Sequence, residues 1–169
     1  MTVLLWRIGT DTPGCTADDL SGGGAKLTGG RWNRVGIAVT YASDSIALAC
    51  LETLVHPGAH ALPFNRYLVR IAVPDEVFAR RVRFEDLMSE TARVGWDALP
   101  AGKVSIELGS RWALSGASAL LELPSAVIEE ERNYLINPAH ADTALLLAVK
   151  QRRFTYDSRL RRAGVDSRR

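Results

Sequence analysis

The sequence predicts an α+β domain with mostly antiparallel sheet and two or three helices. Strand-like segments outnumber helical ones, strands and helices do not alternate regularly, and no Gly-x-Gly-x-x-Gly follows the first strand. These observations disfavour a doubly wound fold and a Rossmann dehydrogenase. A length of 169 residues, with 47% hydrophobic and 24% charged residues, suits one globular domain over residues 1–169.

Three segments open the chain: an apolar strand over residues 3–8, a polar glycine-rich loop over 9–30, and a β-rich strand over 35–41. A helix should follow. Ser43 or Asp44 is expected to cap it, and it should run to about His56, where Pro57 and Gly58 end it.

The second half of the chain is predicted to be richer in strands. Residues 67–73 alternate as a half-buried strand closed by Pro74. The other expected elements are a strand over 78–84, helices over 85–91 and 105–114, and β-like segments over 119–123, 126–128, 134–136, 144–149 and 154–156.

Charge is distributed unevenly along the chain. Residues 150–169 carry eight basic and two acidic side chains, a net charge of +6, which leaves 13 basic and 17 acidic residues, or −4, elsewhere. This basic end, including the tail at about 161–169, suits nucleic acid, an acidic partner or a solvated terminus. No aromatic stacking platform is interleaved with its arginines, so a nucleic-acid-binding module is the alternative rather than the leading interpretation.

No membrane partner is expected. Uncharged apolar runs fall short of the roughly 18 residues a membrane span needs, and the first residues lack the basic start of a signal peptide. Cys15 and Cys50 are interpreted as reduced thiols, so a cytoplasmic protein is expected.

Arg31 follows two glycines in the stretch Gly29-Gly30-Arg31-Trp32-Asn33. Glycines let a backbone approach a ligand closely, and a guanidinium presents a fork of donors suited to phosphate. Trp32 adds a stacking surface. The structural alternative is a turn that carries a surface arginine.

Glu52 lies within the most apolar helical segment of the chain. A carboxylate there loses solvation unless it has a partner, so it either pairs with an arginine such as Arg31 or faces a ligand. His56 follows four residues later on the same helical face. No second histidine pair or cysteine cluster supports a metal site, and none is expected.

Other polar candidates lie on strands and turns. Ser125 follows Pro124 without the Gly-x-Ser-x-Gly elbow of a hydrolase, which indicates a hydrogen-bonding or capping hydroxyl rather than a nucleophile. Tyr41 is either a core residue or a stacking face. Asn137 and Pro138 form a tight turn within residues 133–140.

Taken in order, these segments resemble the RES domain, the toxin half of RES–Xre toxin–antitoxin modules. The resemblance spans roughly residues 5–160. It rests on the stretches around Trp6-Arg7-Ile8, Gly29–Asn33, Tyr41-Ala42-Ser43, Ala47–His56, Leu123-Pro124-Ser125, Asn133–His140 and Phe154–Leu160. The arginine, glutamate and serine that name the domain correspond to Arg31, Glu52 and Ser125.

The resemblance implies a fold similar to ADP-ribosyltransferase toxins such as diphtheria toxin, with NAD⁺ as substrate and no metal. It implies depletion of NAD⁺ by hydrolysis or phosphorolysis, or transfer of ADP-ribose to a host protein. It also implies a cognate Xre-like antitoxin that blocks the active site. DNA would then be bound only indirectly, through the antitoxin.

The same chemistry suggests a role for each candidate. Glu52 would stabilise the oxocarbenium character that develops when the nicotinamide–ribose bond breaks. Arg31 would hold the pyrophosphate, Tyr41 the nicotinamide and Ser125 the ribose. Arg7, His56 and Asn137 are the further NAD⁺-binding candidates. The acidic run at residues 129–131 is expected to be a solvated loop, although a second glutamate would suit a transferase.

Overall fold

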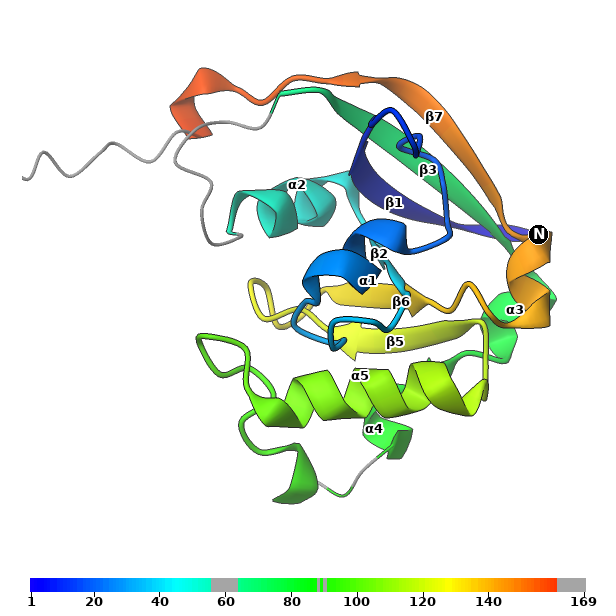
Figure 1. Cartoon of the computed structure of the whole chain (residues 1–169), viewed down its shortest axis with the longest axis vertical. Helices are drawn as coiled ribbons and strands as arrows, with labels where there is room; N and C mark the ends of the chain where they lie inside the picture. Colours follow the sequence, from blue (N-terminus) through cyan, green and yellow to red (C-terminus); the bar gives the residue numbers. More distant parts are fainter. Residues whose placement is uncertain (56–63, 88, 90, 161–169) are drawn as a thin grey trace, which may run out of the picture.

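A computed structural model describes residues 1–55, 64–87, 89 and 91–160 of the chain (Figure 1). Its sheet has seven strands in the order β4-β5-β6-β2-β1-β3-β7. The strands are β1 (Thr2–Thr10), β2 (Thr40–Ser43), β3 (Arg66–Pro74), β4 (Val82–Arg83), β5 (Leu120–Pro124), β6 (Arg132–Ile136) and β7 (Leu147–Phe154). In the described part of the chain every neighbouring pair is antiparallel except β4 and β5, so the predicted α+β class is confirmed.

The sheet consists of two halves joined at a narrow seam. The long strands β1, β3 and β7 form one half, and β2, β6, β5 and β4 form the other, as the upper and lower ribbons of Figure 1 show. At the seam, β1 and β2 share the single register pair Trp6 and Ser43. Backbone pairing is therefore weakest at this junction, and side chains from both halves lie next to it.

Two longer and three short α-helices, with three 3-10 helices, accompany the sheet in the described part of the chain. The α-helices are α1 (Gly23–Thr28), α2 (Ile46–Leu54), α3 (Asp75–Ala79), α4 (Phe84–Leu87) and α5 (Lys103–Ser115), and the 3-10 helices are η1 (Thr91–Arg93), η2 (Ala141–Leu145) and η3 (Ser158–Leu160). Only α2 and α5 exceed six residues among these α-helices. The predicted helices therefore include both long ones and overlap the short α4, whereas α1 and α3 were missed because one or two turns leave no clear periodicity.

Three apolar clusters hold the elements together. One fills the space between β1, β3 and the β5–β6 pair, and includes Leu5, Ile71 and Leu120. A second lies between α5 and the lower strands, around Trp112. In the third, the side chains of Ile8, Ala49, Leu68 and Tyr156 hold α2 against β1 and β3. Each buried leucine or isoleucine contributes about 1.5–3 kcal/mol, so α2 is fixed by packing on one side.

Several predicted elements match the structure, and the strand expected over 35–41 does not. The strands over 3–8, 67–73, 119–123 and 134–136 and the helix over 105–114 are confirmed. The strand expected over 35–41 is wrong, since β2 begins only at Thr40. Asn33 is the reason: its side-chain amide donates to the carbonyls of Ala25 and Ile37, both at 2.9 Å, so this segment is tied into a turn.

Two further strand predictions are wrong for local reasons. Residues 78–84 divide into the end of α3, a turn, the two-residue β4 and the start of α4. Residues 126–128 form a bend, because the Ser125 hydroxyl accepts from the backbone N–H groups of Val127 at 3.0 Å and Ile128 at 3.2 Å. These N–H groups are thus unavailable to a strand partner.

The remaining differences concern boundaries. The loop expected over 9–30 contains α1, and the helix expected over 85–91 is divided between α4 and η1. Of the segments expected over 144–149 and 154–156, only residues 147–149 and Phe154 lie in β7: η2 includes Ala144 and Leu145, and residues 155–156 follow the end of the strand. The first five residues of the basic end, 150–154, therefore belong to an edge strand of the sheet.

Candidate active site

Helix α2 carries Glu52 to the seam between the two sheet halves. It packs against β1 and β2, and its first turn is capped by Ser45, whose hydroxyl accepts from the N–H of Leu48 at 3.0 Å. The caps expected at Ser43 or Asp44 are wrong. Ser43 is still part of β2, and the Asp44 carboxylate accepts instead from the backbone of Arg132 at 3.0 Å.

The half-buried Glu52 carboxylate is held by two side chains from the lower half of the sheet. Oε1 of Glu52 accepts a hydrogen bond from the Ser125 hydroxyl at 2.8 Å and another from the Asn133 side-chain amide. Oδ1 of Asn133 accepts in turn from the Ser43 hydroxyl at 2.7 Å. Strands β2, β5 and β6 therefore jointly orient this carboxylate.

Ser125 lies directly after β5 and is fully buried. Its hydroxyl proton points to Glu52, and its oxygen accepts from the two backbone N–H groups of the following bend. A hydroxyl has one proton and two lone pairs, so these three bonds use all of them. In this arrangement Ser125 supports Glu52, and its hydroxyl has no group left for a ribose.

The Tyr41 hydroxyl is fixed by two hydrogen bonds and is influenced by the charges of both Arg31 and Glu52. Its hydroxyl donates to Oδ1 of Asn33 at 2.7 Å and accepts from the backbone N–H of Trp32 at 3.1 Å. Burial raises the pKa of Tyr41 far above its usual range, while the charge of Arg31 opposes this rise and that of Glu52 adds to it. Tyr41 is therefore a neutral phenol near both predicted catalytic groups.

Residues 29–33, the arginine segment, are hydrogen-bonded to a loop that is distant in the sequence. Nη1 of Arg31 donates to the backbone carbonyls of Trp96 at 3.2 Å and Ala98 at 3.0 Å. The Trp96 ring stacks on Trp32 with centroids 5.7 Å apart and an interplanar angle of 19°. Arg31 and Glu52, both in the described part of the chain, form no ion pair, so the salt bridge considered as the structural alternative is absent.

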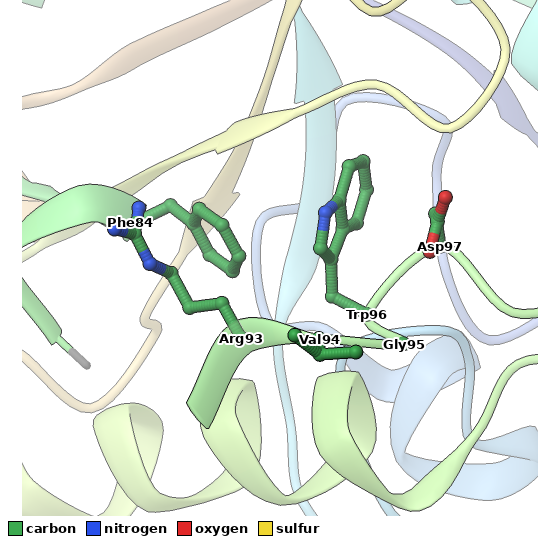
Figure 2. Close-up of a pocket in the computed structure, with 6 residues that line it drawn as sticks. All are labelled: Phe84, Arg93, Val94, Gly95, Trp96 and Asp97. Atoms are coloured by element: carbon green, nitrogen blue, oxygen red, sulfur yellow. The ribbon is translucent and has the colours of Figure 1, made fainter. Parts of the chain in front are cut away.

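An open pocket of about 380 Å³ adjoins this loop. Figure 2 shows the side chains of Phe84, Arg93 and Trp96 at its wall, and the two aromatic rings meet edge to face with centroids 5.6 Å apart. The carbonyl of Trp96 thus holds Arg31 while its ring borders the pocket. No signal in the sequence connected residues 93–97 with Arg31, because the contact joins residues more than sixty positions apart.

Two of the further predicted NAD⁺-binding residues, Arg7 and Asn137, form no hydrogen bond or ion pair with Glu52 in the part of the chain that the structure describes. Arg7 is largely buried on β1, where burial lowers its pKa, and its Nε has no hydrogen-bond partner. Asn137 is buried, and its amide donates to the carbonyl of Ala113 at 2.9 Å and accepts from Ala139 at 3.0 Å. This amide supports the turn and the end of α5. His56 lies outside the described residues.

Sequence reasoning missed Ser43 and Asn133 as parts of the site. The signal that was available is the strand register, since Ser43 on β2 pairs directly with Asn133 on β6. Two small polar residues facing each other across otherwise apolar strands indicate a buried hydrogen-bonded pair. Their partnership depends on strand pairing, which the sequence pattern alone does not specify.

The described residues bear on two further kinds of site, a metal site and a membrane span. Across residues 1–55, 64–87 and 91–160, no three His, Cys, Asp or Glu side chains lie close enough together to bind a metal ion. Over the same part of the chain, no helix is long and apolar enough to span a membrane.

Comparison with known structures defines the class of fold first. The toxin–antitoxin complex MbcT–MbcA of M. tuberculosis contains a chain that superposes with a TM-score of 0.58 at 17% identity, covering 90% of this chain and 85% of that one. The described architecture is therefore the ADP-ribosyltransferase-like α+β fold.

Sequence comparison then defines the family: the RES domain matches residues 4–157, and the chain belongs to the RES domain family. A Prs ADP-ribosylating toxin of Sphingobium sp. is 56% identical over 160 residues, covering 95% of this chain and 98% of that protein. Proteins named Toxin Res in Photorhabdus laumondii and Pseudomonas putida are 35% and 34% identical, covering 85% and 94% of this chain and 88% and 99% of theirs. The chain is thus a toxin of this family.

Proposed function

We propose that this toxin cleaves the nicotinamide–ribose bond of NAD⁺. The observation that carries the proposal is the Glu52 carboxylate, held half-buried at the sheet seam by two donors that converge on one of its oxygens. Positive charge develops on the ribose as the glycosidic bond breaks, and a fixed carboxylate in a poorly solvated site stabilises that charge.

Arg31 and Tyr41 suit the rest of the dinucleotide. Among the described residues, the carbonyls of Trp96 and Ala98 engage Nη1 of Arg31 and none engages its Nε or Nη2, so these two atoms form an edge that matches two phosphate oxygens. Tyr41, a neutral phenol fixed by Asn33 and Trp32, provides a rigid ring face for nicotinamide. The substrate would then lie along Arg31, Tyr41 and Glu52.

Two acceptors for the ADP-ribose are considered. Water or phosphate as acceptor would deplete cellular NAD⁺, which is the leading form of the proposal. Transfer to a protein is the second candidate, and it is favoured by one observation: the relative that is 56% identical is named an ADP-ribosylating toxin. Both forms share the same bond cleavage and require the same Glu52 carboxylate.

An enzyme of this kind needs control, and we propose an Xre-like antitoxin that covers the mouth of the site. The related fold was solved as a toxin–antitoxin complex. Leu27 and Val35 flank the arginine segment and are 79% and 69% exposed, which supports a partner that docks beside Arg31. Any contact with DNA would be made through this partner.

A product assay tests the proposal. The purified chain is incubated with NAD⁺, with and without phosphate, and the products are separated by chromatography. Nicotinamide with free ADP-ribose indicates hydrolysis, and ADP-ribose-1″-phosphate formed only with phosphate indicates phosphorolysis. Labelled NAD⁺ added with a bacterial lysate puts label on a protein band if transfer is the activity. Intact NAD⁺ in all three reactions contradicts the proposal.

A further inference from the structure

We infer that Asn133 and Ser43 are positioning residues for Glu52, and that they select the carboxylate oxygen that meets the substrate. The inference rests on the proposed function and extends it to two residues outside the arginine, glutamate and serine that name the domain. It concerns a chain of contacts that runs from β2 through β6 to α2.

Asn133 lies where three elements meet. In the sheet it pairs with Ser43 of β2 on one side and with Leu123 of β5 on the other. Its side chain is 9% exposed and reaches across to the helix residue Glu52. Because β6 is flanked on both sides by hydrogen-bonded strands, the Asn133 side chain projects from a rigid base.

Ser43 holds the Asn133 amide in the orientation that its contact with Glu52 requires. A side-chain amide has an acceptor end and a donor end, which exchange places when the group turns over. Because a carboxylate only accepts hydrogen bonds, the NH₂ end of Asn133 faces Glu52, and the Ser43 hydroxyl donates to the opposite end, Oδ1 of Asn133, at 2.7 Å. In the reversed orientation Oδ1 would face the carboxylate and repel it.

Both donors converge on the same oxygen of Glu52. Asn133 and Ser125 each donate to Oε1, and among the described residues none donates to Oε2. A carboxylate oxygen has room for further hydrogen bonds, so Oε2 is the atom left to accept from a ribose hydroxyl or face the anomeric carbon. Ser43, Asn133 and Ser125 therefore act through Glu52 rather than on the substrate.

The test is a double-mutant cycle on NAD⁺ consumption. Asn133→Ala should lower kcat about 10- to 100-fold and leave KM within about twofold, because the lost interaction matters in the transition state. Ser43→Ala should lower kcat by a smaller factor. The double variant should be no slower than Asn133→Ala alone, because Ser43 acts only through Asn133.

Two matched variants separate positioning from a general loss of packing. Ser43→Thr keeps the hydroxyl and should restore most of the kcat lost in Ser43→Ala. Ser118→Ala removes an equally buried hydroxyl, bonded to Trp112 and Leu120 at the opposite end of β5, and should leave kcat unchanged. Three results would overturn the inference. The kcat losses of the two single variants could multiply in the double variant, the main effect could be a raised KM, or Ser118→Ala could lose as much kcat as Ser43→Ala.

A spectroscopic readout keeps this inference separate from the proposed function. Wild-type turnover of NAD⁺ tests the function itself. The ¹⁵N side-chain amide resonances of Asn133 report the contacts directly: they should move in Glu52→Gln and in Ser43→Ala but not in Ser118→Ala. Resonances that stay in place in the first two variants contradict the contact chain, whether or not the protein consumes NAD⁺.

Discussion

Gly30 shows how a single residue can control the site. A Cβ added there would lie 2.6 Å from the hydroxyl of Tyr41 and 3.0 Å from Oδ1 of Asn33. Both atoms belong to the hydrogen bonds that hold Tyr41, and neither can move without breaking one of them. The absence of a side chain at Gly30 thus allows the backbone next to Arg31 to pack closely against the tyrosine.

Gly30→Ala is therefore expected to lower NAD⁺ turnover about tenfold or more, because the methyl group displaces the Tyr41 ring and costs about 1–3 kcal/mol of overpacking. Gly24→Ala is the matched control, since an added Cβ there meets nothing within 4 Å, and it should keep wild-type turnover. Steady-state rates of both variants provide the measurement, and equal rates would contradict this account of Tyr41.

The tyrosines give a second prediction at the residue scale. Burial raises the pKa values of Tyr41, Tyr134 and Tyr156. The folded chain therefore holds these protons more tightly than the unfolded chain, so their contribution to stability is complete below about pH 10 and is lost as the pH rises further.

Urea midpoints measured from about pH 8 to 11 should therefore fall above about pH 10. Phenolate absorbance from these three residues should develop together with unfolding. Ionisation of every tyrosine near pH 10 in a protein that keeps its native circular dichroism would contradict the assigned burial.

At the scale of elements, the loop at residues 93–98 fixes the arginine segment. Trp96 stacks on Trp32 and packs against Phe84, while the carbonyls of Trp96 and Ala98 hold Arg31. Removing the Trp96 ring takes away the packing that keeps these carbonyls in place, although Trp96 itself makes no contact with Glu52.

Trp96→Ala should therefore raise KM for NAD⁺ about tenfold through Arg31, with a smaller effect on kcat. It should also lower stability by up to about 3 kcal/mol, since the ring is only partly buried. Trp96→Phe retains an aromatic face and should lie between the two. A normal KM in a destabilised Trp96→Ala protein would show that the loop stabilises the fold without positioning Arg31.

Elements with regular patterns could be predicted from sequence, whereas those governed by side-chain-to-backbone bonds could not. The alternation over 67–73 and the apolar run over 3–8 gave β3 and β1 with nearly correct bounds. The amide of Asn33 and the hydroxyl of Ser125 replace strand hydrogen bonds locally, and so the strands expected after each of them fail to form.

In the candidate site, too, some residues could be predicted from the sequence and others could not. Glu52 was predicted as a site residue because a carboxylate in an apolar helix is unusual, and its contact with Ser125 joins two of the predicted residues. The Ser43–Asn133 hydrogen bond, and the hydrogen bonds from Arg31 to the carbonyls of Trp96 and Ala98, join residues that are 65–90 positions apart in the sequence. Such pairings carry no periodic signal along the chain.

At the scale of the whole molecule, the basic end is not one uniform tail. Lys150 lies in β7 and its amine contacts the Asp11 carboxylate at 2.7 Å, so part of the positive charge is paired within the fold. Removing residues 150–169 would delete an edge strand along with the charge. The nucleic-acid alternative is better tested by a shorter deletion.

Removal of residues 161–169 should leave NAD⁺ consumption within about twofold of the full chain, since the candidate site lies on α2 and the sheet strands. If the alternative holds instead, the full chain binds DNA with an affinity that falls steeply with salt, and the shortened chain does not. DNA binding by fluorescence anisotropy at two salt concentrations, set beside NAD⁺ turnover, distinguishes these outcomes.

The most direct test of the central claim is Glu52→Gln, assayed for nicotinamide release from NAD⁺ beside the wild-type chain. The amide keeps the shape of the side chain and removes its charge, so we expect release to fall by about 100-fold or more. Circular dichroism and the Tm should stay close to wild type. Nicotinamide release at the wild-type rate from a folded Glu52→Gln protein would contradict the assignment of this carboxylate and the mechanism built on it.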